Sequence, residues 1–146
     1  MEQETDYILK EVKRLTTFIT NLISNVSTLN SDEIKSGIKE TDDFIKKEWN
    51  LSFKEIISLT EIEFINRLKE LPEVHLEKLA ELLSEIIKKI DTPELKNKYN
   101  KNELANKGIL LIDNINKKSK VYSMKRMEIK NVLQQRTELK NNSFLH

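Results

Sequence analysis

The sequence predicts an all-α fold, and three observations favour this class. Leu, Ile, Lys and Glu are abundant, and these residues mostly suit helices. Only two Gly and two Pro are present, which leaves little turn chemistry for β-hairpins. Apolar residues also recur at helical spacing along most of the chain. We expect a multi-helix bundle or short helical array of about six helices, with a single helical domain over residues 1–136 and a polar tail over residues 137–146.

Length and composition narrow the possible function classes. A domain of this size buries roughly 68 to 70% of the surface that its unfolded chain exposes, so one hydrophobic core can form without disulfides or structural metals. The chain has no cysteine, which excludes disulfides, thiolate metal sites and cysteine nucleophiles. Residues 1–5 lack the basic and apolar regions of a secretory signal. The longest uncharged run, residues 15–31, is too rich in Thr, Ser and Asn to span a membrane. We therefore expect a cytoplasmic protein.

The first predicted helix covers residues 5–26. Its apolar residues alternate spacings of four and three, which is a heptad pattern: Ile8, Val12, Leu15, Ile19, Leu22, Val26 and Leu29. Tyr7, Phe18 and Ile23 widen this row, so the helix can pack as an ordinary core helix or as a coiled coil. The second predicted helix begins at Ser31, an N-cap residue followed by two acids, and ends near Asn50. Its predicted buried row is Ile34, Ile38, Thr41 and Ile45.

Two capping boxes follow the second helix. Ser52 with Glu55 and Thr60 with Glu63 have the spacing at which both side chains satisfy backbone amides. They predict short helices over residues 53–58 and 61–71, with one continuous helix as the alternative. Pro72 then either interrupts the helical structure or lies in the first turn of the next helix. That helix buries Leu76, Leu79, Leu83, Ile86 and Ile90.

The C-terminal third predicts a helical hairpin. Thr92 and Pro93 are a strong helix start, and we expect this helix to reach residue 118. Gly108 lies in its apolar row near Ala105, and a glycine inside a helix indicates close approach of a neighbour. The last helix starts at Ser123 and fades near Arg136. Residues 92–118, the link 119–122 and the last helix resemble a hairpin of tetratricopeptide type, although the full signature of that repeat is absent.

A second resemblance covers more of the chain. It rests on Asp6, Tyr7, Ile8, Leu9, Leu82, Leu83, Lys117, Lys118, Ser119, Tyr122 and Ser123. These segments resemble small bacterial proteins of a family with no known function that end in such a hairpin. The resemblance implies a bacterial helical protein, and it carries over no catalytic residue.

Charge is distributed unevenly along the chain. Residues 1–95 carry 13 basic and 20 acidic residues, a net charge of −7, whereas residues 96–146 carry 12 and 4, a net charge of +8. The basic set clusters near the final link: Lys117, Lys118, Lys120, Lys125, Arg126 and Lys130. With Tyr122 among them, these cations could bind nucleic-acid phosphates. The alternative is that they bind the acidic half of the same chain.

Other charged residues carry weaker signals. Glu73, Glu77, Glu81 and Glu85 form a ladder on one ridge of a helix, which predicts a solvated ridge or pairing with Lys96, Lys98 and Lys101 or a partner. His75 has no ligand three or four residues away and is predicted to lie on the surface. Glu40, Asp42, Asp43 and Glu48 lack the Glu-x-x-His of di-iron bundles and predict a solvated acidic face.

The non-core side of the first helix is uncharged, whereas the rest of this chain places Lys and Glu on such surfaces. Thr17, Asn21, Ser24 and Thr28 are its predicted interface residues. A partner protein, a second copy of the chain or its own C-terminal helices could cover it. No phosphate loop or catalytic triad is recognisable. We therefore expect a non-enzymatic protein-interaction module, which could also form a homodimer. We expect no cofactor and no bound metal. Nucleic-acid binding is the alternative function.

Overall fold

The computed structural model is all-helical over the residues it describes, which are 2–145 for the backbone and 6–136 for the side chains. Eight helices follow one another in this part of the chain: α1 (Glu2–Ser27), α2 (Ile34–Trp49), α3 (Phe53–Ser58), α4 (Glu61–Leu68), α5 (Glu73–Lys89), α6 (Pro93–Lys98), α7 (Lys101–Lys118) and α8 (Met124–Leu145). The predicted fold class is thus confirmed, although the number of helices is larger than expected.

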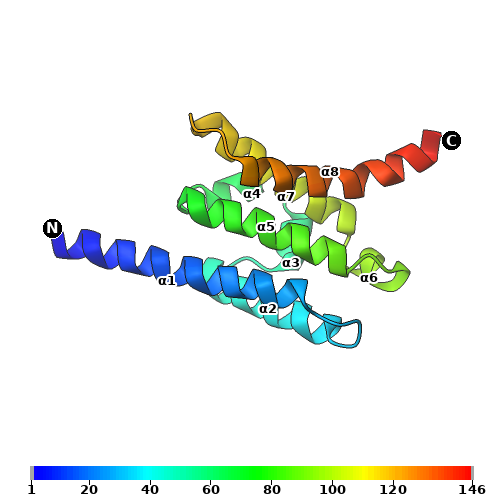
Figure 1. The fold of residues 1–146 in the computed structure, drawn as a ribbon, viewed down its shortest axis with the longest axis horizontal. Helices are drawn as coiled ribbons and strands as arrows, with labels where there is room; N and C mark the ends of the chain where they lie inside the picture. The colour runs from blue at the N-terminus through cyan, green and yellow to red at the C-terminus, as the bar shows by residue number, and fades with distance from the viewer. Residues whose placement is uncertain (1, 146) are drawn as a thin grey trace.

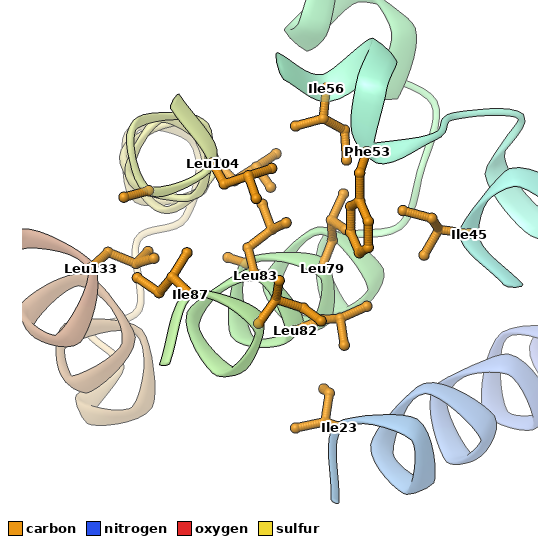
Figure 2. Packing of buried hydrophobic residues seen from close by; sticks show 14 of the residues in the cluster. Ile23, Ile45, Phe53, Ile56, Leu79, Leu82, Leu83, Ile87, Leu104 and Leu133 are labelled. Carbon is orange, nitrogen blue, oxygen red and sulfur yellow. The ribbon is translucent and has the colours of Figure 1, made fainter. Parts of the chain in front are cut away.

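Helix α5 lies at the centre of the molecule. It packs against α1 on one side and α7 on the other, and α8 contacts both α5 and α7 (Figure 1). All five residues predicted to point inward from α5 are buried. Leu82 and Ile87 are buried as well, so α5 is apolar around most of its circumference, as expected for a central helix. Figure 2 shows its side chains meeting residues from α1, α2, α3, α7 and α8.

Both capping boxes form as predicted. The Ser52 and Thr60 side chains accept hydrogen bonds from the amides of Glu55 and Glu63, and each glutamate reaches back to its own N-cap amide. These boxes define two separate short helices, α3 and α4, which confirms the two-helix prediction over the continuous one. Both helices pack on α7. Short helices of this length are unstable alone, so tertiary contacts hold them.

Four predicted helix boundaries are wrong. Helix α4 ends at Leu68 and not at residue 71. Helix α2 begins at Ile34, because residues 31–33 form a turn in which Glu33 accepts a hydrogen bond from the Asn30 amide. The helix from Pro93 ends at Lys98, and α7 begins after Asn100, which has a left-handed backbone (φ 45°) and caps α7. Helix α8 continues past Arg136 to Leu145, across a segment that has neither Gly nor Pro to stop it. The side chains of the predicted tail, 137–146, lie outside the described residues.

The two C-terminal helices pack together as a helical hairpin, and Gly108 lies at their contact. A Cβ atom added to Gly108 would stand 2.8 Å from Cδ1 of Leu133, a fully buried side chain of α8. The predicted close approach at Gly108 is therefore confirmed. No helix in the part of the chain that the structure describes is long and apolar enough to cross a membrane.

Candidate protein interface

The six residues of the predicted basic set separate into two groups. Lys125 Nζ lies 2.9 Å from Glu81, Lys130 Nζ lies 2.7 Å from Asp113, and Arg126 is buried beside Glu73 and Glu77. The hydrogen bond to Glu81 raises the pKa of Lys125. Three of the six cations therefore neutralise the chain's own acids. Lys117, Lys118 and Lys120 are exposed.

The glutamate ladder on α5 is not merely solvated. Arg126 bridges Glu73 and Glu77, Lys125 pairs with Glu81, and Lys88 pairs with Glu85. The counterparts differ from the lysines expected, because α8 rather than α6 lies along this ridge of α5. Of the expected lysines, Lys101 pairs with Asp91 instead. The ladder thus joins α8 to α5 within one chain.

The prediction that His75 lies on the surface is wrong. Its side chain is 3% exposed. Its Nε2 atom lies 3.1 Å from both the Val12 carbonyl and the Thr16 hydroxyl, and its ring lies beside that of Trp49. The histidine therefore connects the first turn of α5 to the middle of α1. Periodicity could have indicated this, because His75 stands four residues before the buried Leu79 and therefore on the same face of the helix.

A buried lysine that was not predicted from the sequence lies on α7, three residues after Leu104 and four before Leu111. Lys107 is 1% exposed, and its Nζ atom donates to the carbonyls of Ile56 and Leu59 and to Glu103 at 2.6 to 2.9 Å. The ammonium also lies 5.6 Å from the Phe64 ring centre. Lys107 thus satisfies carbonyls at the C-terminal end of α3, which is a structural role.

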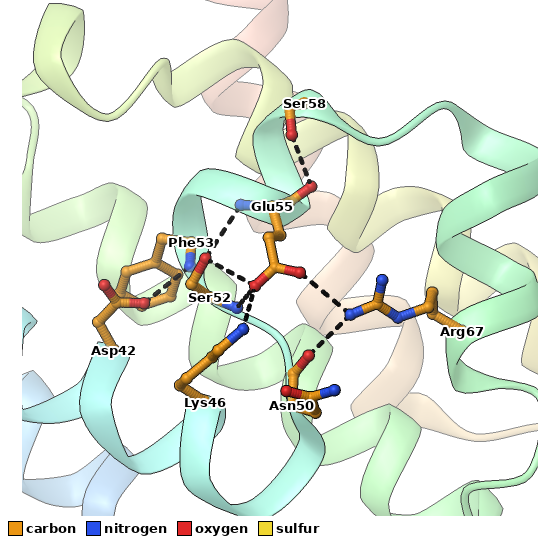
Figure 3. Close-up of polar contacts among 8 residues, drawn as sticks. All are labelled: Asp42, Lys46, Asn50, Ser52, Phe53, Glu55, Ser58 and Arg67. Carbon is orange, nitrogen blue, oxygen red and sulfur yellow. Dashed lines mark hydrogen bonds and ion pairs between the residues drawn. The ribbon is translucent and has the colours of Figure 1, made fainter.

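The predicted carboxylate cluster is dispersed. Asp42 accepts a hydrogen bond from the Phe53 amide at 2.7 Å, at the N-terminus of α3 (Figure 3). Among the described residues, no group of three or more His, Cys, Asp or Glu side chains is placed to hold a metal ion. Asp42 therefore supports the fold, whereas Glu40 and Asp43 are exposed.

The uncharged face of α1, defined by Thr17, Asn21, Ser24 and Thr28, is exposed. Helix α1 packs against α5 and α2, so the chain's own C-terminal helices do not cover this face as one alternative had it. Hydroxyls on and beside it donate back to the helix: Thr16 to Val12, Thr20 to Thr16, Ser27 to Ser24 and Thr28 to Asn25. The threonines among them consequently need no further acceptor if a partner displaces water from the face.

A small hollow borders the uncharged face. Phe18 of α1 and Phe44 of α2 stack with ring centres 5.9 Å apart. Together with Asn21, Leu22 and Asn25 they line a cavity of about 130 Å³ that opens to solvent. Phe18 remains 54% exposed. A cavity of about 150 Å³ accommodates a benzene ring, so this hollow has room for one apolar side chain.

A second and larger hollow lies between α2 and the end of α6. It has a volume of about 400 Å³ and is lined mainly by Lys35, Lys39, Lys98 and Tyr99. Its cations are exposed, and Lys35 is paired with Glu94 at the rim. Asp42 also lines it but already accepts a hydrogen bond from the Phe53 amide, so the remaining charges of this hollow lie on exposed lysine side chains.

Comparison of the chain with known protein families, with curated proteins and with solved structures found no match. The resemblances to a tetratricopeptide hairpin and to small bacterial proteins therefore stay predictions. Function has to be argued from the surfaces of this chain alone.

Proposed function

We propose that this protein is a non-enzymatic interaction module that binds a helix of another protein along the uncharged face of α1. The observation that carries the proposal is the combination of that face with the hollow between Phe18 and Phe44. Amphipathic helices commonly bind in this way, with an apolar anchor in a groove and neighbouring residues along the helix making lesser contacts.

The chemistry of the face favours a largely uncharged partner helix. The hydroxyls of Thr28 on the face and Thr20 beside it are already satisfied within α1, and none of the four side chains that define the face is charged, so dehydration of the face costs less than it would over lysines or glutamates. Asn21 and Asn25 border the hollow and can form hydrogen bonds with a partner. The partner therefore presents one Leu, Met or aromatic side chain with small polar residues around it.

The distribution of cations gives less support to nucleic-acid binding. Lys125, Arg126 and Lys130 already contact carboxylates of the same chain. A phosphate backbone would have to compete with those fixed partners, and each lost phosphate contact weakens binding.

A triple variant tests the proposal. Thr17→Lys, Asn21→Glu and Ser24→Lys together place charges on the face, and desolvation of charged side chains at an interface is costly even where they pair with one another. We expect helicity by circular dichroism to remain, while a partner identified by affinity capture and then purified binds the variant at least about 100-fold more weakly. Ile62→Lys, at an exposed apolar residue of α4, is the control and should bind normally. Equal binding of the purified partner to wild type and triple variant would refute the proposal.

A further inference from the structure

The link between α7 and α8 carries a concentrated group of exposed apolar side chains. Val121, Tyr122 and Met124 are each at least 70% exposed, and Met127 is 50% exposed. Scattered exposed apolar residues are normal, but a local group of them marks an interaction site. The α7–α8 link lies at the tip of the hairpin formed by these two helices, at upper left in Figure 1. We call these four side chains the apolar tip.

Cations surround the apolar tip on both sides in the sequence. Lys117, Lys118 and Lys120 precede it and are exposed, and Lys125 lies within it. Lys125 pairs with Glu81, whereas Lys117, Lys118 and Lys120 form no ion pair within the described residues and extend the positive surface from the end of α7 into the link. Apolar side chains ringed by lysines are the combination that binds an anionic lipid surface.

The buried Arg126 fixes the conformation of the link. Its guanidinium donates to the Val121 carbonyl at 2.6 Å and to Asn116 Oδ1 at 2.8 Å, and it pairs with Glu77. The Val121 amide donates to the Ser119 hydroxyl. The link is therefore pinned from inside, so its apolar side chains are held outward and lose little conformational freedom on docking.

We propose that the apolar tip docks this protein onto an anionic membrane surface, with Val121, Tyr122 and Met124 entering the headgroup region and Lys117, Lys118 and Lys120 contacting lipid phosphates and carboxylates. Tyrosine prefers such interfaces because its ring is apolar and its hydroxyl is polar. Val and Met favour lipid over nucleic acid, whose bases stack on aromatic rings and not on aliphatic side chains. This tip is separate from the α1 face, so the inference stands independently of the proposed function.

The N-terminal part of α1 carries a similar combination of residues. Tyr7, Ile8 and Leu9 are each more than half exposed, and Lys10 and Lys13 follow them. Contacts connect this region to the same end of the molecule, because His75 joins Val12 to the start of α5 and Arg126 joins the start of α5 to the link. It gives the membrane a second point of contact.

Flotation of the full chain with lipid vesicles tests this proposal. At low salt we expect binding to phosphatidylcholine vesicles that contain a third phosphatidylserine and little binding to pure phosphatidylcholine. Lys118→Gln with Lys120→Gln should lower the partition coefficient about 25-fold, since each lysine near an anionic surface contributes about fivefold. Val121→Asp with Met124→Asp should abolish binding, whereas the control Ile62→Asp should not. Circular dichroism checks that each variant is folded.

Fluorescence distinguishes insertion from adhesion by charge alone. Trp49 is the single tryptophan of the chain, so Trp49→Phe with Tyr122→Trp places the only reporter at the tip. We expect its emission to shift to shorter wavelength on addition of the anionic vesicles. The proposal fails if emission does not shift, if the Val121 and Met124 variant binds as well as wild type, or if single-stranded RNA or DNA binds at physiological salt while the vesicles do not.

Discussion

Two polar residues, Lys107 and His75, are buried in this chain instead of lying on its charged surface. Lys107 is the clearest case, because its ammonium replaces water for two carbonyls at the end of α3. Its place on the buried face is visible in the sequence, three residues after Leu104 and four before Leu111, but its acceptors are not, since they depend on where α3 ends in space. His75 is similar, because its partners lie on α1, far away in the sequence.

The Lys107 contacts predict a large effect on stability. Lys107→Met keeps the volume of the stem but leaves the Ile56 and Leu59 carbonyls without their donor. The free energy of unfolding should fall by about 3 kcal/mol, measured by urea denaturation. Lys88→Met, at a largely exposed lysine of α5, is the control and should change it by less than about 0.5 kcal/mol. Equal small effects for both variants would show that Lys107 is solvated.

At the level of elements, capping chemistry and buried rows in the sequence predict most helices correctly. The exceptions are boundaries decided by a single residue. Asn100 leaves the helical region and caps α7 with its own side chain. Asparagine tolerates left-handed backbone better than most residues, but Asn also occurs inside helices, so Asn100 alone did not predict the break. Helix α8 is likewise longer than predicted. Its last part has neither Gly nor Pro to end a helix, and apolar periodicity alone does not indicate this.

Glu55 shows how one side chain holds three helices together. Its carboxylate accepts from Lys46 of α2 at 2.6 Å, from Arg67 of α4 at 3.0 Å and from the Ser52 amide before α3 (Figure 3). The hydrogen bond from Lys46, then that from the Ser52 amide, lowers the pKa of Glu55 from its ordinary value of 4.5 to about 2. The carboxylate form of Glu55 is therefore favoured more strongly in the folded state than in the unfolded chain.

This pKa shift predicts how stability depends on pH. A carboxyl whose folded pKa is lowered stabilises the fold above its unfolded value and loses that contribution as pH falls. The melting temperature should therefore decline between pH 4.5 and about 2, with a further contribution from Asp91, whose pKa is lowered by Lys101. Glu55→Gln should have a lower melting temperature than wild type at neutral pH, and its melting temperature should fall less on acidification. Glu61→Gln, at an exposed residue of α4, should keep the wild-type profile. Parallel curves for all three proteins would contradict this.

At the scale of the whole molecule, the uneven charge along the sequence is explained in part by internal pairing. Arg126 and Lys125 of α8 neutralise glutamates of α5. Arg136 of α8 similarly pairs with Asp91. The sequence left open whether the basic third meets a partner or its own acidic half, because a charge count does not say which helices are neighbours. Among the described residues, the uncharged face of α1 and the apolar tip are exposed, and these are the surfaces that we propose for partners.

The candidate interface itself was predictable only in part. The uncharged side of α1 is visible in the sequence as a run without Lys or Glu, but the run left open that the chain's own C-terminal helices cover it, whereas the face is exposed in the folded chain. The hollow beside it was not predictable, because Phe18 and Phe44 belong to different helices that stack only in the folded chain. We propose that this face, with its hollow, binds another protein.

Site-specific photo-cross-linking in living cells of the source organism tests that claim most directly. A photoreactive amino acid at Asn21 lies on the rim of the hollow, whereas one at Ile62 occupies an equally accessible position on α4. We predict one dominant cross-linked protein at position 21, absent at position 62 and lost when Phe44→Asp closes the hollow to apolar side chains. The same faint background of cross-links at positions 21 and 62 would contradict the account.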